Sequence, residues 1–350
     1  MDNNPLFKHG GFHPNFQEEK NFFLECKVYS IQIEANLACR QGCIYCYASH
    51  DDTPATELPH DDIISIINTA VKMGIKAIDW LGGDPLLRQD WYDLMKYAQA
   101  SGLINNIWTS GIPLAKKDTA KKAVEVTKGG FISVHLDTLN EDIYQKLHIG
   151  NPQKKIKAIL NGVDNVQYYG KNPDHMINCI TFTKLVADDV SCTIRFFFKE
   201  KGMRTCLTQM CMTGLAADRK DLVPSPEEIQ HACEARDRIN YPSSPLSIST
   251  MDTTKFYCGG IICITIEGNV TPCSVIREGV GNIHETPLET IIEKHKPELL
   301  FTHLREKKNL PSDCRQCENN SICWGCRATA YYTYGDATAN DPKCYKHKIK

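Results

Sequence analysis

The chain has 350 residues, 42% hydrophobic and 23% charged, which is enough for one large domain and a smaller one around a sizeable core. Its 40 Lys and Arg against 42 Asp and Glu give a formal charge of −2, which indicates neither nucleic acid nor a membrane surface as a partner. The first residues lack the apolar run of a signal peptide and no apolar stretch reaches the ~20 residues of a membrane span, so we expect a soluble, cytoplasmic protein.

Residues 1–27 are polar and aromatic and are predicted to form a covering segment, in which His9 and His13 have surface or packing roles. From residue 28, apolar alternation typical of strands is followed by apolar spacing typical of helices, six times over. The predicted strands are Tyr29–Ala35, Ala77–Leu81, Asn106–Thr109, Phe131–Leu136, Met176–Phe182 and Arg204–Met210. This order predicts an α/β fold with a parallel sheet, whose chemistry gathers at the C-terminal ends of the strands.

Helices are predicted between these strands. The first has Asp61 as its N-cap, and the others cover about 88–101, 115–127, 140–147 with 152–169, and 187–200. Residues 217–257 are predicted to form a bridge, which contains a helix with Ser225 as its cap and Pro226 at its first position.

Seventeen cysteines are unevenly distributed, with three between residues 39 and 46 and eight between residues 258 and 344. In a reducing compartment this usage favours metal binding or catalysis over disulfides. Most of the other six are expected to act as small buried hydrophobic residues. These six are Cys26, Cys179, Cys192, Cys206, Cys211 and Cys233.

The first strand runs into Cys39, Cys43 and Cys46, which have the spacing C-x3-C-x2-C. A [4Fe–4S] cluster takes one thiolate per iron, so three thiolates leave one iron open to a small molecule. Half a zinc site, or chance in a cysteine-rich chain, is the alternative. The run resembles the signature of the radical S-adenosylmethionine (radical SAM) superfamily, with Tyr45 at the usual aromatic position. The resemblance implies a partial (β/α)6 barrel over residues 28–216, in which SAM chelates the open iron.

Later strand ends match positions that contact SAM in this family. Asp84 ends a run similar to the family's Gly-Gly-Glu motif, which holds the SAM amino group, although its carboxylate is one methylene shorter. The two glycines before it predict close approach of a ligand to the backbone. His135 stands where the family often has serine, and a structural role is an open alternative for it, as is a turn cap for Asp137. The predicted SAM contacts are Tyr45, Gly82, Gly83, Asp84, Ser110, His135 and Asp137.

The segment 258–350 has the pattern C-x9-G-x4-C, C-x2-C-x5-C-x2-C and a final cysteine, with a hairpin that turns at Glu267 and Gly268. It resembles the SPASM extension of radical SAM enzymes, except that its last knuckle has two residues between the cysteines rather than three. Paired C-x2-C knuckles also build zinc ribbons, which is the alternative for this region.

The SPASM resemblance implies two auxiliary [4Fe–4S] clusters, and therefore three in the chain. Motif order assigns Cys258, Cys273 and Cys326 to the first auxiliary cluster, and Cys263 is the candidate fourth ligand. Without Cys263, that cluster has an open iron that could bind substrate. The predicted ligands of the second auxiliary cluster are Cys314, Cys317, Cys323 and Cys344.

Together the resemblances imply an oxidoreductase that works without oxygen, takes an electron from a flavodoxin or ferredoxin, and abstracts hydrogen from its substrate. The auxiliary clusters would take the second electron. A ribosomal peptide or protein is the first expected substrate. A small cofactor, as in haem-pathway decarboxylation, is the alternative, since only ~27 residues precede the first strand and leader-binding domains are longer. A non-catalytic metal-binding scaffold is a third class. No catalytic acid or base is clear; His135, Asp137 and Tyr257 are candidates by position alone.

Overall fold

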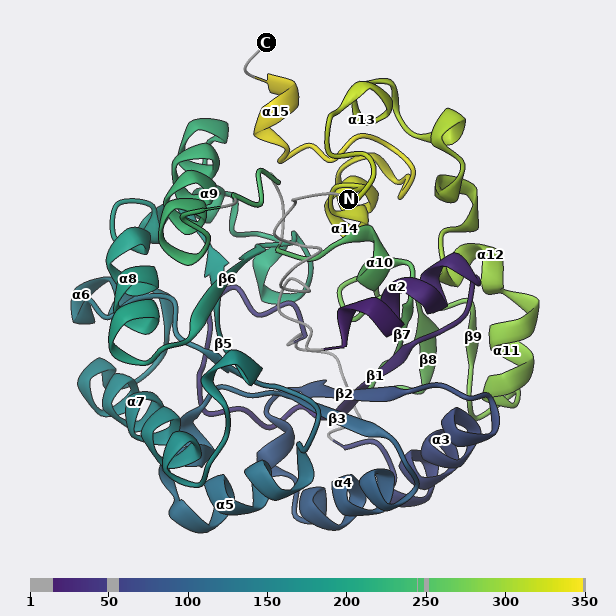
Figure 1. Ribbon diagram of the computed structural model, residues 1–350, viewed down its shortest axis with the longest axis horizontal. Helices are drawn as coiled ribbons and strands as arrows, with labels where there is room; N and C mark the ends of the chain where they lie inside the picture. Colours follow the sequence, from purple (N-terminus) through teal and green to yellow (C-terminus); the bar gives the residue numbers. More distant parts are fainter. Residues whose placement is uncertain (1–14, 49–56, 244, 249–251, 349–350) are drawn as a thin grey trace.

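The computed structural model describes residues 15–48, 57–243, 245–248 and 252–348. Their strands form one sheet of order β6-β5-β4-β3-β2-β1-β7-β8-β9, which curls into a partial barrel with helices outside it (Figure 1). The six predicted strands are confirmed within two residues at each end. They are β1 (Ser30–Asn36), β2 (Ala77–Gly82), β3 (Ile104–Trp108), β4 (Ile132–His135), β5 (Met176–Phe182) and β6 (Arg204–Gln209), all paired in parallel.

The connecting helices pack an apolar stripe against the outer face of the sheet (Figure 1). They are α3 (His60–Lys72), α4 (Trp91–Ala100), α5 (Lys117–Val126), α6 (Glu141–Leu147), α7 (Pro152–Tyr168) and α8 (Val190–Glu200). The prediction for Asp61 was wrong, because α3 begins two residues earlier than that cap implies, with Pro59 as its N-cap. Asp61 lies in the first turn instead, where a carboxylate interacts favourably with the positive end of the helix.

The strand β1 separates an apolar outer layer from a polar interior. Ile31 and Ile33 are fully buried in the outer core, and the alternate residues Gln32 and Glu34 are buried on the other face. Because each buried polar group needs a partner, the interior of the barrel contains a hydrogen-bonded network instead of an apolar core.

The C-terminal half continues the same sheet. Strand β7 (Ile261–Ile264) pairs in parallel with β1, and β8 (Asn269–Thr271) and β9 (Gly281–Asn282) follow in antiparallel order. The predicted hairpin is confirmed, and its turn residue Gly268 has a φ of +82°, a conformation that favours glycine. The pairing of β7 with β1 was not predicted, and it joins the cysteine-rich segment to the barrel.

The remaining helices cover the open side of the barrel and the cysteine-rich segment (Figure 1). Ser225 caps the helix of the bridge through a capping box with Glu228, which confirms the prediction. The helices are α2 (Phe16–Leu24), α9 (Pro226–Asn240), α10 (Lys255–Cys258), α11 (Leu288–Lys294), α12 (Lys296–Leu299), α13 (Ser312–Gln316), α14 (Arg327–Tyr334) and α15 (Tyr345–Lys348).

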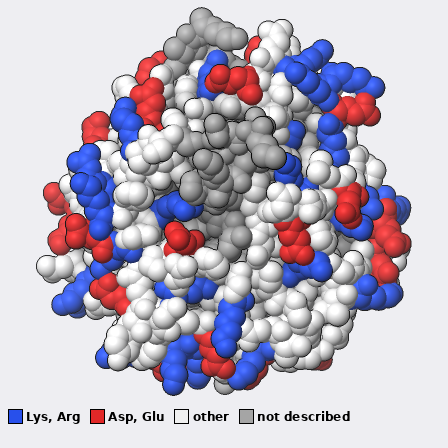
Figure 2. Space-filling view, in the orientation of Figure 1, with Lys and Arg blue, Asp and Glu red and all other residues white. Residues whose placement is uncertain are grey.

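The helix α2 lies within the predicted covering segment and packs on the cysteine-rich half. The Phe23 ring lies 5.1 Å from that of Phe256 and 5.4 Å from that of Trp324, between ring centroids. The predictions for His9 and His13 fall outside the described residues. Within the described ranges, no helix has both the length and the apolar character needed to cross a bilayer. Figure 2 shows basic and acidic side chains interspersed over one face.

Candidate functional site

The cysteine loop 39–46 lies directly beyond the end of β1 and is held from two sides. On one side, the Gly83 N–H donates to the Asn36 carbonyl (2.6 Å) and the Asp84 N–H donates to the Ala38 carbonyl (2.7 Å). On the other side, the loop pairs with the residues that follow α6, where Cys43 and His148 form an antiparallel bridge. These contacts with β2 and with the end of α6 therefore fix the backbone of the loop.

Gly82, the last residue of β2, and Gly83 both lie tightly against the backbone of the cysteine loop. A Cβ atom on Gly82 would lie 2.2 Å from the Asn36 carbonyl oxygen, and one on Gly83 would lie 2.4 Å from the Ala38 carbonyl oxygen. The space that we expected a ligand to use is occupied by the backbone of the cysteine loop. The two glycines thus allow β2 to approach that loop, and contact of their carbonyl groups with a ligand amine stays a prediction.

The loop carries three free cysteines, of which Cys39 is exposed and Cys43 and Cys46 are half-buried. Partial burial and the Asp84 carboxylate together raise the pKa of Cys39 to about 11. Burial likewise raises the pKa of Cys43, and the neighbouring Cys46 adds to the effect. Neighbouring thiolates repel one another, and a bound cationic metal removes that repulsion. The donor set at Cys39, Cys43 and Cys46 therefore suits an iron–sulfur cluster.

The Asp84 side chain joins the ends of β2 and β3. Its buried carboxylate accepts hydrogen bonds from the Thr109 hydroxyl (2.8 Å), the Ser110 N–H (3.0 Å) and the Ser110 hydroxyl (2.5 Å). It also accepts the Leu86 N–H at 3.2 Å. Burial raises the pKa of Asp84, and these donors oppose that rise. Two residues predicted to contact SAM, Asp84 and Ser110, thus bind each other.

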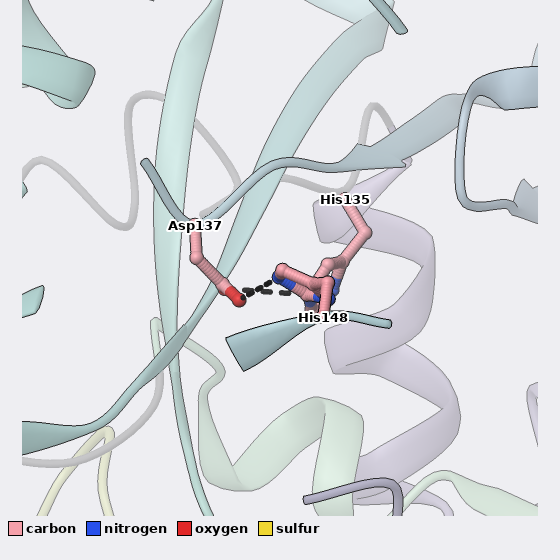
Figure 3. Close-up of side chains that lie close together, drawn as sticks. All are labelled: His135, Asp137 and His148. Carbon is pink, nitrogen blue, oxygen red and sulfur yellow. Dashed lines mark hydrogen bonds and ion pairs between the residues drawn. The ribbon is translucent and has the colours of Figure 1, made fainter. Parts of the chain in front are cut away.

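A second buried carboxylate, Asp137, lies under the cysteine loop. Figure 3 shows the imidazole rings of His135 and His148 converging on it. The Nε2 atoms lie 3.2 Å and 3.0 Å from its two oxygens, respectively. The carboxylate also accepts the Tyr45 hydroxyl and, at 2.9 Å, the Thr181 N–H. Asp137 has no exposed surface for the predicted ribose contact, whereas the His135 side chain is 21% exposed.

The two histidines favour the ionised form of the Asp137 carboxyl. Burial acts to raise the pKa of Asp137, but His135 and His148 together hold that pKa well below its usual range. Burial lowers the pKa of His148, while at His135 the Asp137 carboxylate outweighs burial and raises the pKa. Potential ligand atoms of the three side chains lie within 4.8 Å of one another, so they could also hold a single metal ion.

Tyr257, a candidate by position, is enclosed within the interior network. Its hydroxyl donates to the Asp79 carboxylate at 2.9 Å and accepts from the Gln32 side-chain amide at 2.9 Å. Burial raises the pKa of Tyr257, and the Asp79 carboxylate adds to this. The hydroxyl thus already has a donor and an acceptor, which leaves it little capacity to act on a substrate.

The four cysteines predicted to hold the second auxiliary cluster meet at one pocket. Its lining includes Cys314, Cys317, Cys323 and Cys344. Two backbone groups point at these sulfurs, since the Asn319 N–H lies 3.4 Å from the Cys317 sulfur and the Gly325 N–H lies 3.2 Å from the Cys323 sulfur. Donors of this kind stabilise thiolates, so this donor set also suits a cluster.

The ligand set of the first auxiliary cluster stays a prediction. Burial raises the pKa of Cys258 to about 12, and charge on Cys326 and Cys273 contributes to the rise. Cys263 lies in β7, fully buried, with Glu34 and Arg277 as its main charged neighbours. Cys211, directly after the sixth predicted strand, is buried in the apolar cluster against which Cys273 and Cys326 pack, and its thiol donates to the Gln209 carbonyl at 3.7 Å.

The spacing of the sulfur atoms bears on the zinc alternative. Four thiolates about 2.3 Å from one zinc ion lie about 4 Å apart. Among the described residues, the group of His135, Asp137 and His148 is the one in which three or more potential ligand atoms all lie within 4.8 Å of one another. The cysteine groups are therefore more open than a single-ion site, which favours clusters over zinc.

Two family models match the chain. Residues 33–197 match the radical SAM superfamily, and residues 257–318 match the SPASM iron–sulfur cluster-binding domain. An AdoMet-dependent heme synthase of Methanosarcina barkeri is 25% identical over 340 residues, which cover 89% of this chain and 94% of the relative. A probable GTP 3′,8-cyclase of Methanosarcina acetivorans is 23% identical over 288 residues, 77% of this chain and 84% of the relative.

Solved structures share the fold over nearly the whole chain. The enzyme anSMEcpe with bound AdoMet and a Cp18Cys peptide superposes with a TM-score of 0.69 at 14% identity, covering 91% of this chain and 94% of that one. Streptococcus suis SuiB bound to the precursor peptide SuiA gives a TM-score of 0.67 at 17% identity. The match covers 94% of this chain and 80% of the SuiB chain. These likenesses confirm the predicted architecture of a partial barrel followed by a SPASM region.

Proposed function

Because the chain belongs to the radical SAM superfamily and carries a C-terminal SPASM iron–sulfur domain, we propose that this enzyme oxidises an organic substrate by abstraction of a hydrogen atom. The observation that carries the proposal is the parallel pairing of β7 with β1, from Ser30 with Ile261 to Ile33 with Ile264. It joins the strand that leads into Cys39, Cys43 and Cys46 to the strand that leads into the auxiliary cysteines. A metal-binding scaffold needs no such connection.

The cysteines of the 39–46 loop would hold the cluster that binds SAM. When bound, the cluster and SAM supply reductive cleavage of SAM to methionine and a 5′-deoxyadenosyl radical, which abstracts hydrogen from the substrate. The chain itself fixes the loop through β2 and the end of α6, and Asp84 aligns the neighbouring ends of β2 and β3. This rigidity supports the reaction, since orientation and exclusion of water are what the protein contributes.

The two C-terminal cysteine groups would hold auxiliary clusters, which makes three [4Fe–4S] clusters in all. Loss of a hydrogen atom oxidises the substrate by one electron and leaves a radical. A second electron must leave before a stable product forms. The proposed auxiliary clusters take that electron, and a flavodoxin or ferredoxin supplies the electron for SAM cleavage. The gathering of four cysteines at one pocket supports the second of these clusters.

The first substrate class that we propose is a peptide. It is supported by structural neighbours that share both parts of the fold and whose structures contain bound peptides. The second class is a tetrapyrrole, which would undergo oxidative decarboxylation. It is supported by sequence relatives named AdoMet-dependent heme synthase and Fe-coproporphyrin III synthase, which align over most of this chain. A GTP cyclase aligns at a similar identity, so these likenesses do not by themselves choose between the classes.

The test uses enzyme reconstituted without oxygen, with SAM and dithionite. Production of 5′-deoxyadenosine by the parent and not by the variant with Cys39, Cys43 and Cys46 replaced by Ala supports the reaction type. Two probes then separate the substrates. One is iron coproporphyrin III, examined by mass spectrometry for loss of CO2 and two hydrogens. The other is the peptide fraction of cells grown on deuterated amino acids, examined for transfer of deuterium into 5′-deoxyadenosine.

A further inference from the structure

The segment between α6 and α7 lies against the cysteine loop. The Ile149 N–H donates to the Gly42 carbonyl at 2.9 Å, and the Ile44 N–H donates to the Leu147 carbonyl at 3.0 Å. A Cβ atom on Gly42 would lie 3.1 Å from the Ile149 Cβ atom, so the two backbones are in close contact. One hydrogen bond and the peptide bond after Gly42 therefore connect Ile149 to Cys43, a proposed ligand of the SAM-binding cluster.

The side chain of Ile149 is presented to solvent at this fixed position. The residue is 71% exposed, although its backbone is held by the loop. The Lys155 ammonium group donates to the carbonyls of Gln41, at 2.8 Å, and of Ile149. These bonds tie the first turn of α7 to the loop and place a positive charge beside Ile149. An exposed apolar side chain on a rigid backbone is suited to burial against a partner.

The sequence around Ile149 is basic. Residues 143–163 contain no aspartate or glutamate, and they contain four lysines, Lys146, Lys154, Lys155 and Lys157. Lys146 and Lys154 are exposed. Among the described residues no carboxylate forms an ion pair with either of them, whereas the exposed Lys72 and Lys96 each have one. The positive charge at this surface is therefore open to a partner.

The helix α7 carries these charges against its own local preference. Its N-cap Asn151 accepts the Lys154 N–H at 2.8 Å, which places Lys154 in the first turn. That turn contains no acidic residue, whereas the first turns of α3 and α6 contain two each. Because the N-terminus is the positive end of a helix, a lysine there destabilises the helix. Departures from local preference are expected where a residue serves function.

We define the basic surface as Lys146, Ile149, Lys154 and Lys155. We propose that the basic surface binds an acidic, flavodoxin-type protein, which delivers the electron for SAM cleavage to the adjacent cysteine loop. The proposal rests on the proposed function in one respect, that this loop holds the SAM-binding cluster. In the transfer, the flavin of the partner is oxidised by one electron and the proposed cluster is reduced by one electron. No group passes between the two proteins.

Charge and polarity together favour a flavin protein as the occupant. The lysines complement an acidic surface, and opposite charges speed the encounter of two proteins in a manner that salt weakens. The apolar side chain of Ile149 suits the dimethylbenzene edge of a flavin, which is hydrocarbon. An iron–sulfur cluster has no hydrocarbon edge of its own, so a ferredoxin is the competing donor that the test separates.

The test compares two double charge reversals. Lys146→Glu with Lys154→Glu changes the basic surface. Lys121→Glu with Lys128→Glu is the control, because it changes the net charge of the chain by the same amount at another place. Both control lysines line a surface pocket with residues 169–172, which precede β5, so they lie at the opposite end of the barrel from the cysteine loop.

Two readouts are made on the reconstituted enzyme without oxygen. The first is formation of 5′-deoxyadenosine, driven by an acidic flavodoxin with its NADPH-dependent reductase or, separately, by dithionite. The flavodoxin concentration for half-maximal rate should rise about tenfold or more in the Lys146 and Lys154 variant, and the dithionite-driven rate should match that of the parent. The second is flavodoxin binding by isothermal titration calorimetry, which should weaken by a similar factor. Added salt should weaken binding in the parent more than in this variant.

A third variant, Ile149→Ser, tests the apolar contact. It keeps the Cβ atom that lies against Gly42, and it should also raise the half-maximal flavodoxin concentration without changing the dithionite-driven rate. Equal responses of the two double variants to flavodoxin would overturn the proposal, and so would a loss of dithionite-driven cleavage in the Lys146 and Lys154 variant. Dependence on the same residues with a ferredoxin, and not with flavodoxin, would overturn the assignment of the occupant. A parent that fails to cleave SAM with dithionite would instead overturn the proposed function.

Discussion

The Tyr45 hydroxyl donates to the Asp137 carboxylate, and this bond joins the cysteine loop to the residues that follow β4. Tyr45 lies between the second and third cysteines of the loop, so its position determines where those two sulfurs lie. Asp137 in turn accepts donors from His135, His148 and the backbone of Thr181. The buried carboxylate is therefore the common anchor of the loop, of β4 and of the end of α6.

We predict that Asp137→Ala destabilises the protein by about 3–5 kcal/mol, because four donors lose an ionised partner. Tyr45→Phe removes one donor and keeps the anchor, so it should cost about 2 kcal/mol. Urea unfolding measures both. The Asp137 variant should also bind less iron at the SAM-binding site, and equal effects of the two substitutions would contradict the role of Asp137 as an anchor.

We predict that Gly83→Ala disrupts the cysteine loop. The new Cβ atom would lie 2.4 Å from two backbone carbonyl oxygens, those of Leu37 and Ala38, and backbone cannot yield as a side chain can. Cleavage of SAM should fall by about tenfold or more, which corresponds to a displacement that costs about 1.4 kcal/mol. Gly74→Ala is the control, since a Cβ atom there meets nothing within 4 Å, and only its positive φ is strained. Normal SAM cleavage by the Gly83 variant would show that the loop tolerates the shift.

The buried carboxyl of Asp79, inside the barrel, should make the folding stability of the protein depend on pH. Burial raises the pKa of Asp79 to about 6, while hydrogen bonds from Asn106 and Tyr257 act to lower it. A carboxyl whose pKa is higher in the folded state binds its proton more tightly there, so its contribution to stability is complete below the unfolded pKa. That contribution is lost as pH rises through about 6.

The measurement compares the parent with Asp79→Asn, both free of iron, by urea unfolding at pH 5 and pH 7.5. From pH 5 to pH 7.5, the free energy of unfolding should fall by about 1.4 kcal/mol more in the parent than in the variant. Only the parent has the titrating group. Parallel changes in the two proteins would show that Asp79 does not titrate in this window.

Replacing the three cysteines of the first loop should have different effects from replacing the C-terminal cysteines. Their replacement by Ala should abolish SAM cleavage and leave about eight iron per chain, because the C-terminal cysteine groups are built from other segments. Replacing Cys314 and Cys317 by Ala should instead remove about four iron and leave SAM binding intact. The readouts are iron and sulfide content and 5′-deoxyadenosine formation. Activity that persists without the first three cysteines would exclude them as the ligands of the SAM-binding cluster.

The sequence by itself determined the six parallel strands, their helices and the cysteine spacing of both segments. These features are local, since the alternation in β1 and the C-x3-C-x2-C spacing depend on residues that are neighbours in the chain. The capping box at Ser225 was found for the same reason, because it joins residues three positions apart. The resemblance to the superfamily rested on such short runs, and the family models confirm it.

Only the tertiary structure decided what lies beside each of these runs. It placed β7 next to β1, bound Ser110 to Asp84, and brought Tyr257 to Asp79 across more than a hundred residues of chain. Such contacts follow from which strands pair and from the register of that pairing, and a short run of sequence specifies neither. A buried carboxylate or thiol takes the partners that the assembled fold supplies, so its role is settled only when distant segments meet.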